Sequence, residues 1–112
     1  MATIDLSSYT CEGKQVFSRE QARRILGISH PTKFREHLEA LGLNNQLITW
    51  DVIRAVLASR LFVAAGNGKH TKQQFGQIYR NGLMEPALRR FHINLDENFE
   101  RIKNGYNEKS AA

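Results

Sequence analysis

The fold is decided by residues 18–43, which read SREQARRILGISHPTKFREHLEALGL. Ser18 and Gln21 have the spacing of a capping box, in which each side chain bonds an unpaired amide at the start of a helix. Apolar residues then recur at helical spacing, namely Ala22, Ile25 and Leu26. Gly27 follows as a typical helix end, so a first short helix is predicted between Ser18 and Gly27.

A second helix is predicted directly after this turn. Ser29 is the expected N-cap, and Pro31 stands in the first turn, where no amide hydrogen is needed. One face of the helix is apolar at spacings of four and three residues, formed by Phe34, Leu38 and Leu41. Gly42 then ends the helix. Two short helices joined by a tight Gly-Ile-Ser turn are typical of a helix-turn-helix.

Residues Ala22–Ser29 resemble the core of the helix-turn-helix in MerR-type and excisionase-like DNA-binding domains. The run Ser29–Thr32 resembles the opening of their recognition helix. In that family a short hairpin wing leads into a further helix, and residues 43–51 are similar to this connection, with a very short wing that carries no basic residue. The resemblance covers residues 15–62 and implies binding to double-stranded DNA.

The most apolar segment of the chain begins after Thr49, the expected cap of a third helix, with Asp51 placed favourably in its first turn. From there to about Ala65 the sequence is apolar almost all round, which is typical of a buried helix. We therefore predict that this helix is central and that the two preceding helices pack against it. Trp50 is expected to lie at that junction.

The sequence of residues 67–106 predicts a C-terminal helical extension. Thr71 is the expected cap of one helix, a second is expected around Pro86, and a last helix is expected to start at Asn94 or Asp96. The last helix carries a heptad-like stripe that either closes the core or forms a two-fold dimer, made of Leu95, Phe99, Ile102 and Tyr106.

The whole chain is thus predicted to be all-α, a helix-turn-helix with at most a minimal wing plus C-terminal helices packed on a central apolar helix. Residues 1–14 are expected to be irregular, with one short strand around Ile4, Leu6 and Tyr9 as the alternative to simple packing. Residues 15–66 form the expected helix-turn-helix core. Residues 107–112 are expected to be a disordered tail.

Composition narrows the class of protein. The chain has 112 residues, 41% of them hydrophobic and 24% charged, which fits one small globular domain. The single Cys11 excludes an internal disulfide, and no signal peptide or membrane span is recognised. We expect a soluble cytoplasmic protein. The net charge of +5 suits a polyanionic partner, since phosphate neutralisation supplies most non-specific nucleic-acid affinity.

The expected DNA-binding residues follow from the helix-turn-helix, whose second helix projects its first residues into the major groove. On that helix the solvent-facing candidates for bases and phosphates are His30, Thr32, Lys33, Arg35 and His37. Glu36 and Glu39 repel phosphate, so the C-terminal half is expected to turn away. Candidate phosphate contacts on the first helix are Arg19, Arg23 and Arg24.

A second group of basic residues lies outside the resemblance and either extends the phosphate footprint, binds RNA, or is an ordinary solvated face. It comprises Lys69, His70, Lys72, Arg80, Arg89 and Arg90. Within it, Arg89 and Arg90 beside Phe91 and His92 form a candidate stacking site.

No catalytic or metal-binding pattern is found in the sequence. The four histidines are scattered, and no serine stands in a nucleophile elbow. We therefore predict a protein that is not an enzyme and needs no cofactor. The predicted function is sequence-specific DNA binding by a small transcriptional regulator or recombination accessory factor, expected as a homodimer. The alternative is a module that binds another protein or serves in assembly without specific DNA binding.

Overall fold

The computed structural model describes residues 10–11 and 14–111, and this part of the chain is all-α, as predicted. Its helices are α1 (Arg19–Leu26), α2 (Pro31–Leu41), α3 (Trp50–Ala65), α4 (Lys72–Arg80), α5 (Met84–Arg90) and α6 (Leu95–Ala111). The strands β1 (Thr10–Cys11) and β2 (Lys14–Gln15) form one antiparallel pair with Thr10 opposite Gln15. The strand expected around Ile4, Leu6 and Tyr9 lies outside the described residues.

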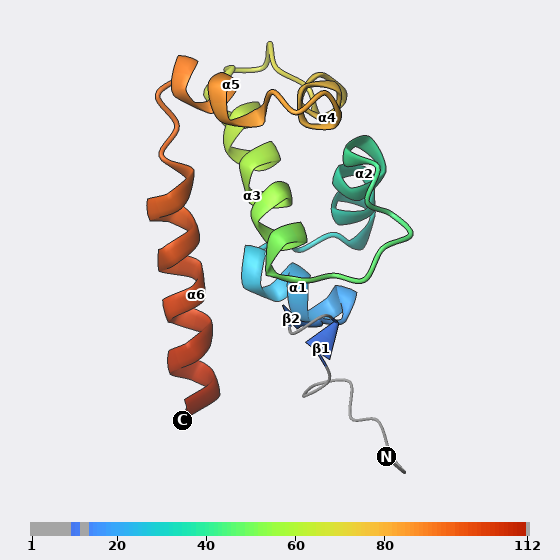
Figure 1. Ribbon diagram of the computed structural model, residues 1–112, viewed down its shortest axis with the longest axis vertical. Coiled ribbons are helices and arrows are strands. Elements are labelled where there is room, and N and C mark those ends of the chain that lie inside the picture. The colour runs from blue at the N-terminus through green and yellow to red at the C-terminus, as the bar shows by residue number, and fades with distance from the viewer. Residues whose placement is uncertain (1–9, 12–13, 112) are drawn as a thin grey trace.

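α3 is the central helix of the molecule, in agreement with the prediction from its apolar sequence (Figure 1). α1, α2, α4 and α6 all pack against it, and α2 and α6 lie on opposite sides of it. Its residues Ile53, Val56 and Ala58 are fully buried. The helix has no polar face wide enough for solvent, so burial on several sides is what its sequence requires.

The ends of α1 and α2 follow the predicted local rules, with one shift. Ser18 and Gln21 form the capping box, and Gly27 ends α1 with a φ of 72°, a left-handed conformation that glycine adopts without steric cost. The N-cap of α2, however, is His30 rather than Ser29, and no side chain caps this end. The residue before a proline favours extended backbone, and here that residue is His30, directly before Pro31.

The segment between α2 and α3 does not form a hairpin wing of its own within residues 14–111. Instead, Ile48 makes an isolated antiparallel bridge with Phe17, whose amide donates a 2.8 Å hydrogen bond to the Ile48 carbonyl. Both side chains are buried, so the connection is tied down beside the start of α1. Leu47 and Ile48 are the only consecutive apolar residues of this segment, and two residues are too few to form a pair of strands.

α4 crosses α2 at close range. Gly76 of α4 is buried, and a β-carbon at this position would lie 2.1 Å from the carbonyl oxygen of Ala40. Only a residue without a side chain permits this backbone-to-backbone approach. On its inner face α2 buries the predicted stripe of Phe34, Leu38 and Leu41, each 1% exposed.

α6 closes the core on the side opposite α2. Leu95 is buried, and Phe99, Ile102 and Tyr106 pack against the core, so the predicted stripe takes the first of its two expected roles. Trp50, expected at the junction of the central helix with the two preceding helices, makes edge-on ring contacts with Phe17 before α1 at 4.8 Å and with Tyr106 of α6 at 5.6 Å.

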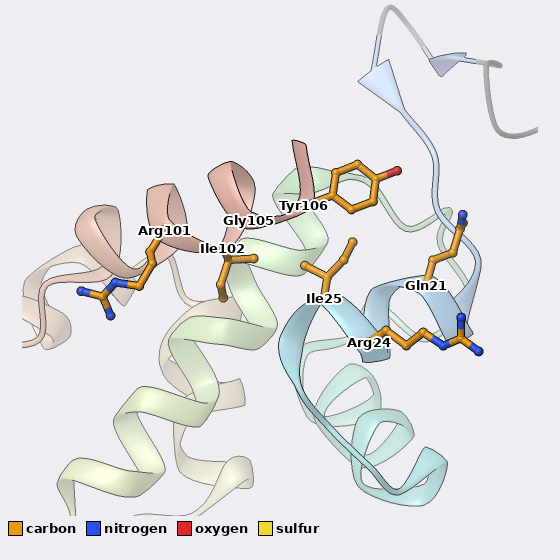
Figure 2. A pocket seen from close by; sticks show the side chains of 7 residues that line it. All are labelled: Gln21, Arg24, Ile25, Arg101, Ile102, Gly105 and Tyr106. Carbon is orange, nitrogen blue, oxygen red and sulfur yellow. The ribbon is translucent and has the colours of Figure 1, made fainter. Parts of the chain in front are cut away.

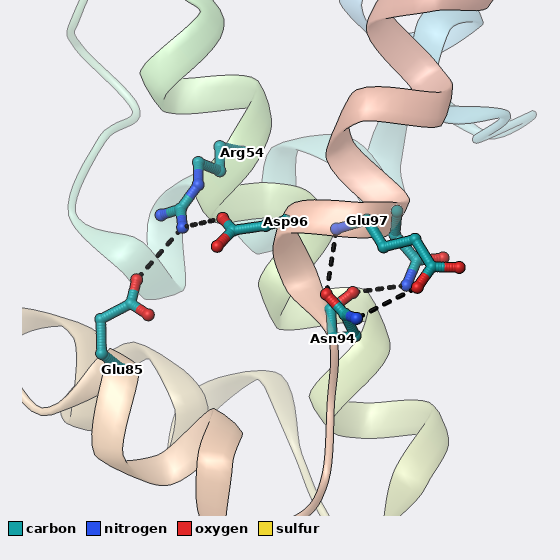
Figure 3. A network of polar contacts seen from close by, with 6 residues as sticks. Arg54, Glu85, Asn94, Asp96 and Glu97 are labelled. Atoms are coloured by element: carbon teal, nitrogen blue, oxygen red, sulfur yellow. Dashed lines mark hydrogen bonds and ion pairs between the residues drawn. The ribbon is translucent and has the colours of Figure 1, made fainter.

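The start of α6 is fixed by polar contacts (Figure 3). Arg54 of α3 pairs with Asp96 at 2.8 Å and with Glu85 of α5 at 3.2 Å. Partial burial disfavours the charged form of Arg54, but the hydrogen bonds that its guanidinium donates to the carboxylates of Asp96 and Glu85 outweigh this and raise its pKa. Asn94 caps the helix by accepting a 3.0 Å hydrogen bond from the amide of Glu97.

α6 also corrects the expected disordered tail, because the helix continues through residues 107–111. The segment contains neither proline nor glycine after Gly105, so nothing in its sequence breaks the helical hydrogen bonding. Among the described residues, no helix is both long and apolar enough to cross a membrane.

Candidate nucleic-acid interface

The N-terminal half of α2 and the residue before it present a basic surface to solvent. His30, Thr32, Lys33 and Arg35 are all exposed, as predicted from the sequence. Within residues 10–11 and 14–111, Lys33 and Arg35 make no ion pair. Both cations are therefore available to an external anion. The helix carrying them is held by its buried opposite face, so their backbone positions are fixed.

His37 is a correction to the predicted set, because it is buried rather than exposed. Its side chain is 8% exposed, and Nδ1 lies 2.8 Å from the hydroxyl oxygen of Ser59 on α3. Burial, together with the positive charges of Lys72 and Arg60, lowers the pKa of the imidazole to about 4. His37 is therefore a neutral core residue that ties α2 to α3.

The sequence contained the signal that places His37 in the core. It stands three residues after Phe34 and four before Leu41, so it belongs to the inward face of α2. Polarity alone suggested exposure, but a histidine whose ring nitrogen has a hydrogen-bond partner is tolerated inside a protein.

The three arginines of α1 have different surroundings. Arg19 donates two hydrogen bonds to Asn44, to the carbonyl oxygen at 2.9 Å and to Oδ1 at 3.0 Å. Arg23 donates to the carbonyl oxygens of Ile28 and Ser29 in the turn before α2, at 3.2 and 3.0 Å. Since these acceptors are neutral, Arg19 and Arg23 keep their full charge. Each also keeps N–H groups for a phosphate.

Arg24 differs because it is paired with Glu20 at 2.6 Å. It also lines a groove of about 420 Å³ between α1 and α6 (Figure 2). The floor of this groove is apolar, with Ile25 and Ile102 facing each other, and Arg101 stands at its other end. Arg19 and Arg23 thus bond the segments directly after and directly before α2. Arg24 instead faces the groove between α1 and α6.

The C-terminal half of α2 is covered by α4. Glu36 pairs with Lys72 at 3.1 Å, and this hydrogen-bonded cation lowers the pKa of the Glu36 carboxyl. Glu39 remains exposed on the same half. The sequence alone did not place α4 over this half of α2. That this half turns away from phosphate stays a prediction.

The second basic group does not form one surface. Lys72 belongs to the groove between α2 and α4, where it faces Glu36. Arg90 lines a groove between α4 and α5, and Arg89 lines another between α5 and the start of α6. Lys69 is exposed in the turn before α4, and Arg80 is exposed at the C-terminal end of α4, where its Nε donates to the Gly76 carbonyl at 3.1 Å.

The candidate stacking site is divided in the same way. Phe91 and Arg90 lie in the groove between α4 and α5, whereas His92 lines the other groove with Arg89.

Groups of three or more potential metal ligands are not found among the described residues. No protein-family model, curated protein or solved structure was found to match the chain.

Proposed function

We propose that this protein binds double-stranded DNA, with the N-terminal half of α2 in the major groove. The observation that carries the proposal is the exposed pair Lys33 and Arg35, both without an ion-pair partner in the described part of the chain. They lie on a helix whose opposite face is locked in the core. Rigid presentation of cationic side chains is what base readout in the major groove requires.

Arg19 and Arg23 complete the proposed interface as phosphate contacts. Their hydrogen bonds to neutral carbonyls orient the guanidinium groups without cancelling their charge. An oriented guanidinium loses less side-chain entropy on binding than a free one. In this proposal the protein acts as a small transcriptional regulator or recombination accessory factor, and a second copy would read a paired half-site.

The test is binding of labelled genomic DNA fragments to the purified protein at two salt concentrations, with unlabelled competitor DNA. A fragment retained under competition supplies the target site. On that site, Lys33→Ala and Arg35→Ala are each expected to weaken binding by about 1–3 kcal/mol and to relax sequence preference. The dependence of affinity on salt counts the phosphates that are neutralised.

Arg101→Ala is the matched control. Like Lys33→Ala and Arg35→Ala, it removes one exposed basic side chain, although Arg101 is paired with Glu97 at i,i+4. It lies on α6, across α3 from α2. Its affinity for the target is expected to match the wild type. If Lys33→Ala and Arg35→Ala bind as tightly as Arg101→Ala, the groove assignment is wrong. If no fragment survives competition, the protein-binding alternative is favoured, and its partner is sought by pull-down.

A further inference from the structure

An aromatic ladder runs from the core to the surface beside α4. The ring of His70 stacks on Phe62 at 4.2 Å between centroids and meets Phe91 edge-on at 4.7 Å. Phe62 is buried and also contacts the fully buried Phe75, at 5.3 Å. Phe91, at the outer end, is 37% exposed. The ladder therefore presents one well-supported aromatic ring to solvent.

The surroundings of that ring form a groove of about 450 Å³ between α4 and α5. Leu83 lines it and is 54% exposed. Of the three large hydrophobic residues exposed in the described chain, two, Leu83 and Phe91, thus line one groove. The guanidinium carbon of Arg90 lies over the Phe91 ring, 5.8 Å from its centroid. Arg90 makes no ion pair within residues 10–11 and 14–111.

The α4 side of the groove is lined by three carboxamides together with the apolar Ile78. Gln74, Gln77 and Asn81 stand at helical spacings of three and four residues, so they share one face, and all are exposed. Gln74 uses its Oε1 in the capping box with Thr71, which leaves its NH₂ group as a donor. No carboxylate from the described residues lines this groove, whereas Glu36 and Glu39 line the groove on the other side of α4.

We propose that this groove binds an unpaired nucleobase of single-stranded nucleic acid. Phe91 supplies the stacking face, Arg90 the cation for the adjacent phosphate, and the carboxamides the hydrogen bonds to the base edge. The absence of an acid from this wall removes the main repulsion against a phosphate backbone. The site is separate from α2 and does not rest on the duplex binding proposed above.

The experiment measures fluorescence anisotropy of labelled 20-nucleotide oligodeoxyadenylate and oligoriboadenylate with the full chain, at low salt. Phe91→Leu keeps an apolar contact to Phe62 and His70 but removes the aromatic face. It is expected to weaken binding roughly ten-fold. Phe91→Tyr keeps the ring and is expected to restore wild-type affinity. Arg90→Gln removes the cation and is expected to reduce the dependence of affinity on salt.

Absence of binding to either oligonucleotide, or equal affinities of the wild type and Phe91→Leu, would overturn the proposal. Displacement of the oligonucleotide by equimolar adenosine monophosphate would reassign the site to a free nucleotide and overturn the strand assignment. Circular dichroism of each variant checks that the helices are intact. The two proposals fail separately, because Phe91→Leu is expected to leave duplex binding unchanged and Lys33→Ala to leave a distinct single-strand site intact.

Discussion

The two halves of α2 differ in how they are held in the molecule. The C-terminal half is fixed on several sides: Ala40 touches Gly76, Glu36 pairs with Lys72, and His37 bonds Ser59. The N-terminal half has solvent around Lys33 and Arg35. α2 is thus fixed by contacts at its C-terminal end and exposed to solvent at its N-terminal end. This arrangement is expected of a helix that must keep its position while it binds a partner.

The C-terminal extension supplies part of the anchor that holds α2, because α4 packs against this helix. α4 covers the half of α2 that carries Glu36 and Glu39, and Lys72 of α4 forms an ion pair with Glu36. Removing parts of this anchor is expected to affect stability first, and binding only through the position of α2. Removing charges is expected to affect binding first.

The largest change in stability is expected from Gly76→Ala. The added β-carbon would lie 2.1 Å from the Ala40 carbonyl oxygen, far inside van der Waals contact, so α4 must move away from α2. We expect a loss of about 3 kcal/mol in the free energy of unfolding, the upper end for overpacked cores. Urea unfolding at constant pH measures it from the shift in midpoint.

Gly105→Ala is the matched control for that substitution. Gly105 also lies within a helix, but a β-carbon there meets nothing within 4 Å. Relief of the glycine entropy cost is expected to stabilise this variant by about 0.5–1 kcal/mol. A Gly76→Ala variant that gains stability in parallel with Gly105→Ala would refute the close crossing of α2 and α4.

The next effect is the pH dependence of stability that His37 produces. The pKa of the folded imidazole is lowered from 6.5 to about 4, so between these values the unfolded chain binds more protons than the folded chain. Stability is therefore complete above pH 6.5 and declines as the pH falls towards 4. The full shift corresponds to about 3 kcal/mol, and partial solvent screening reduces this to roughly 2.

His37→Gln tests the assignment, because glutamine fills a similar volume and does not titrate. The variant keeps Glu36, Lys72 and Arg60, so the difference between its pH profile and that of the wild type isolates the imidazole. Chemical unfolding at several pH values from 7 to 4 measures both profiles. Parallel profiles would show that His37 is solvated and that α2 is less firmly docked than its buried face indicates.

Sequence patterns predicted most of the scaffold because local rules decide it. The capping box at Ser18, the glycine ends and the apolar α3 all depend on residues near one another in the chain. What escaped prediction depends on contacts between distant residues. The His37–Ser59 bond joins positions 22 residues apart, and the Gly76–Ala40 crossing joins positions farther apart still. No periodicity reports such pairings.

The candidate site divides along the same line. Exposure of Lys33 and Arg35 followed from the helical period, and the structure confirms it. Arg90 beside Phe91 was visible in the sequence as part of a candidate stacking site. The carbonyl acceptors of Arg19 and Arg23, and the three carboxamides that line one groove with Arg90 and Phe91, could not be predicted from spacing, because two or more elements must first be placed in space.

The smallest effect concerns the boundary between the two halves, where Glu36 faces both Lys72 and solvent. Glu36→Gln removes a negative charge near the proposed phosphate path. Because Lys72 already offsets part of that charge, duplex affinity is expected to rise only about two- to five-fold at low salt and to approach the wild-type value as salt increases. Lys72→Ala is expected to lower duplex affinity, since it leaves the charge of Glu36 uncompensated.

Glu100→Gln on α6 is the control. It makes the same charge change across α3 from α2 and is expected to leave the affinity for the same duplex unchanged. Equal gains from Glu36→Gln and Glu100→Gln would mean that net charge, rather than the position of α2, governs binding.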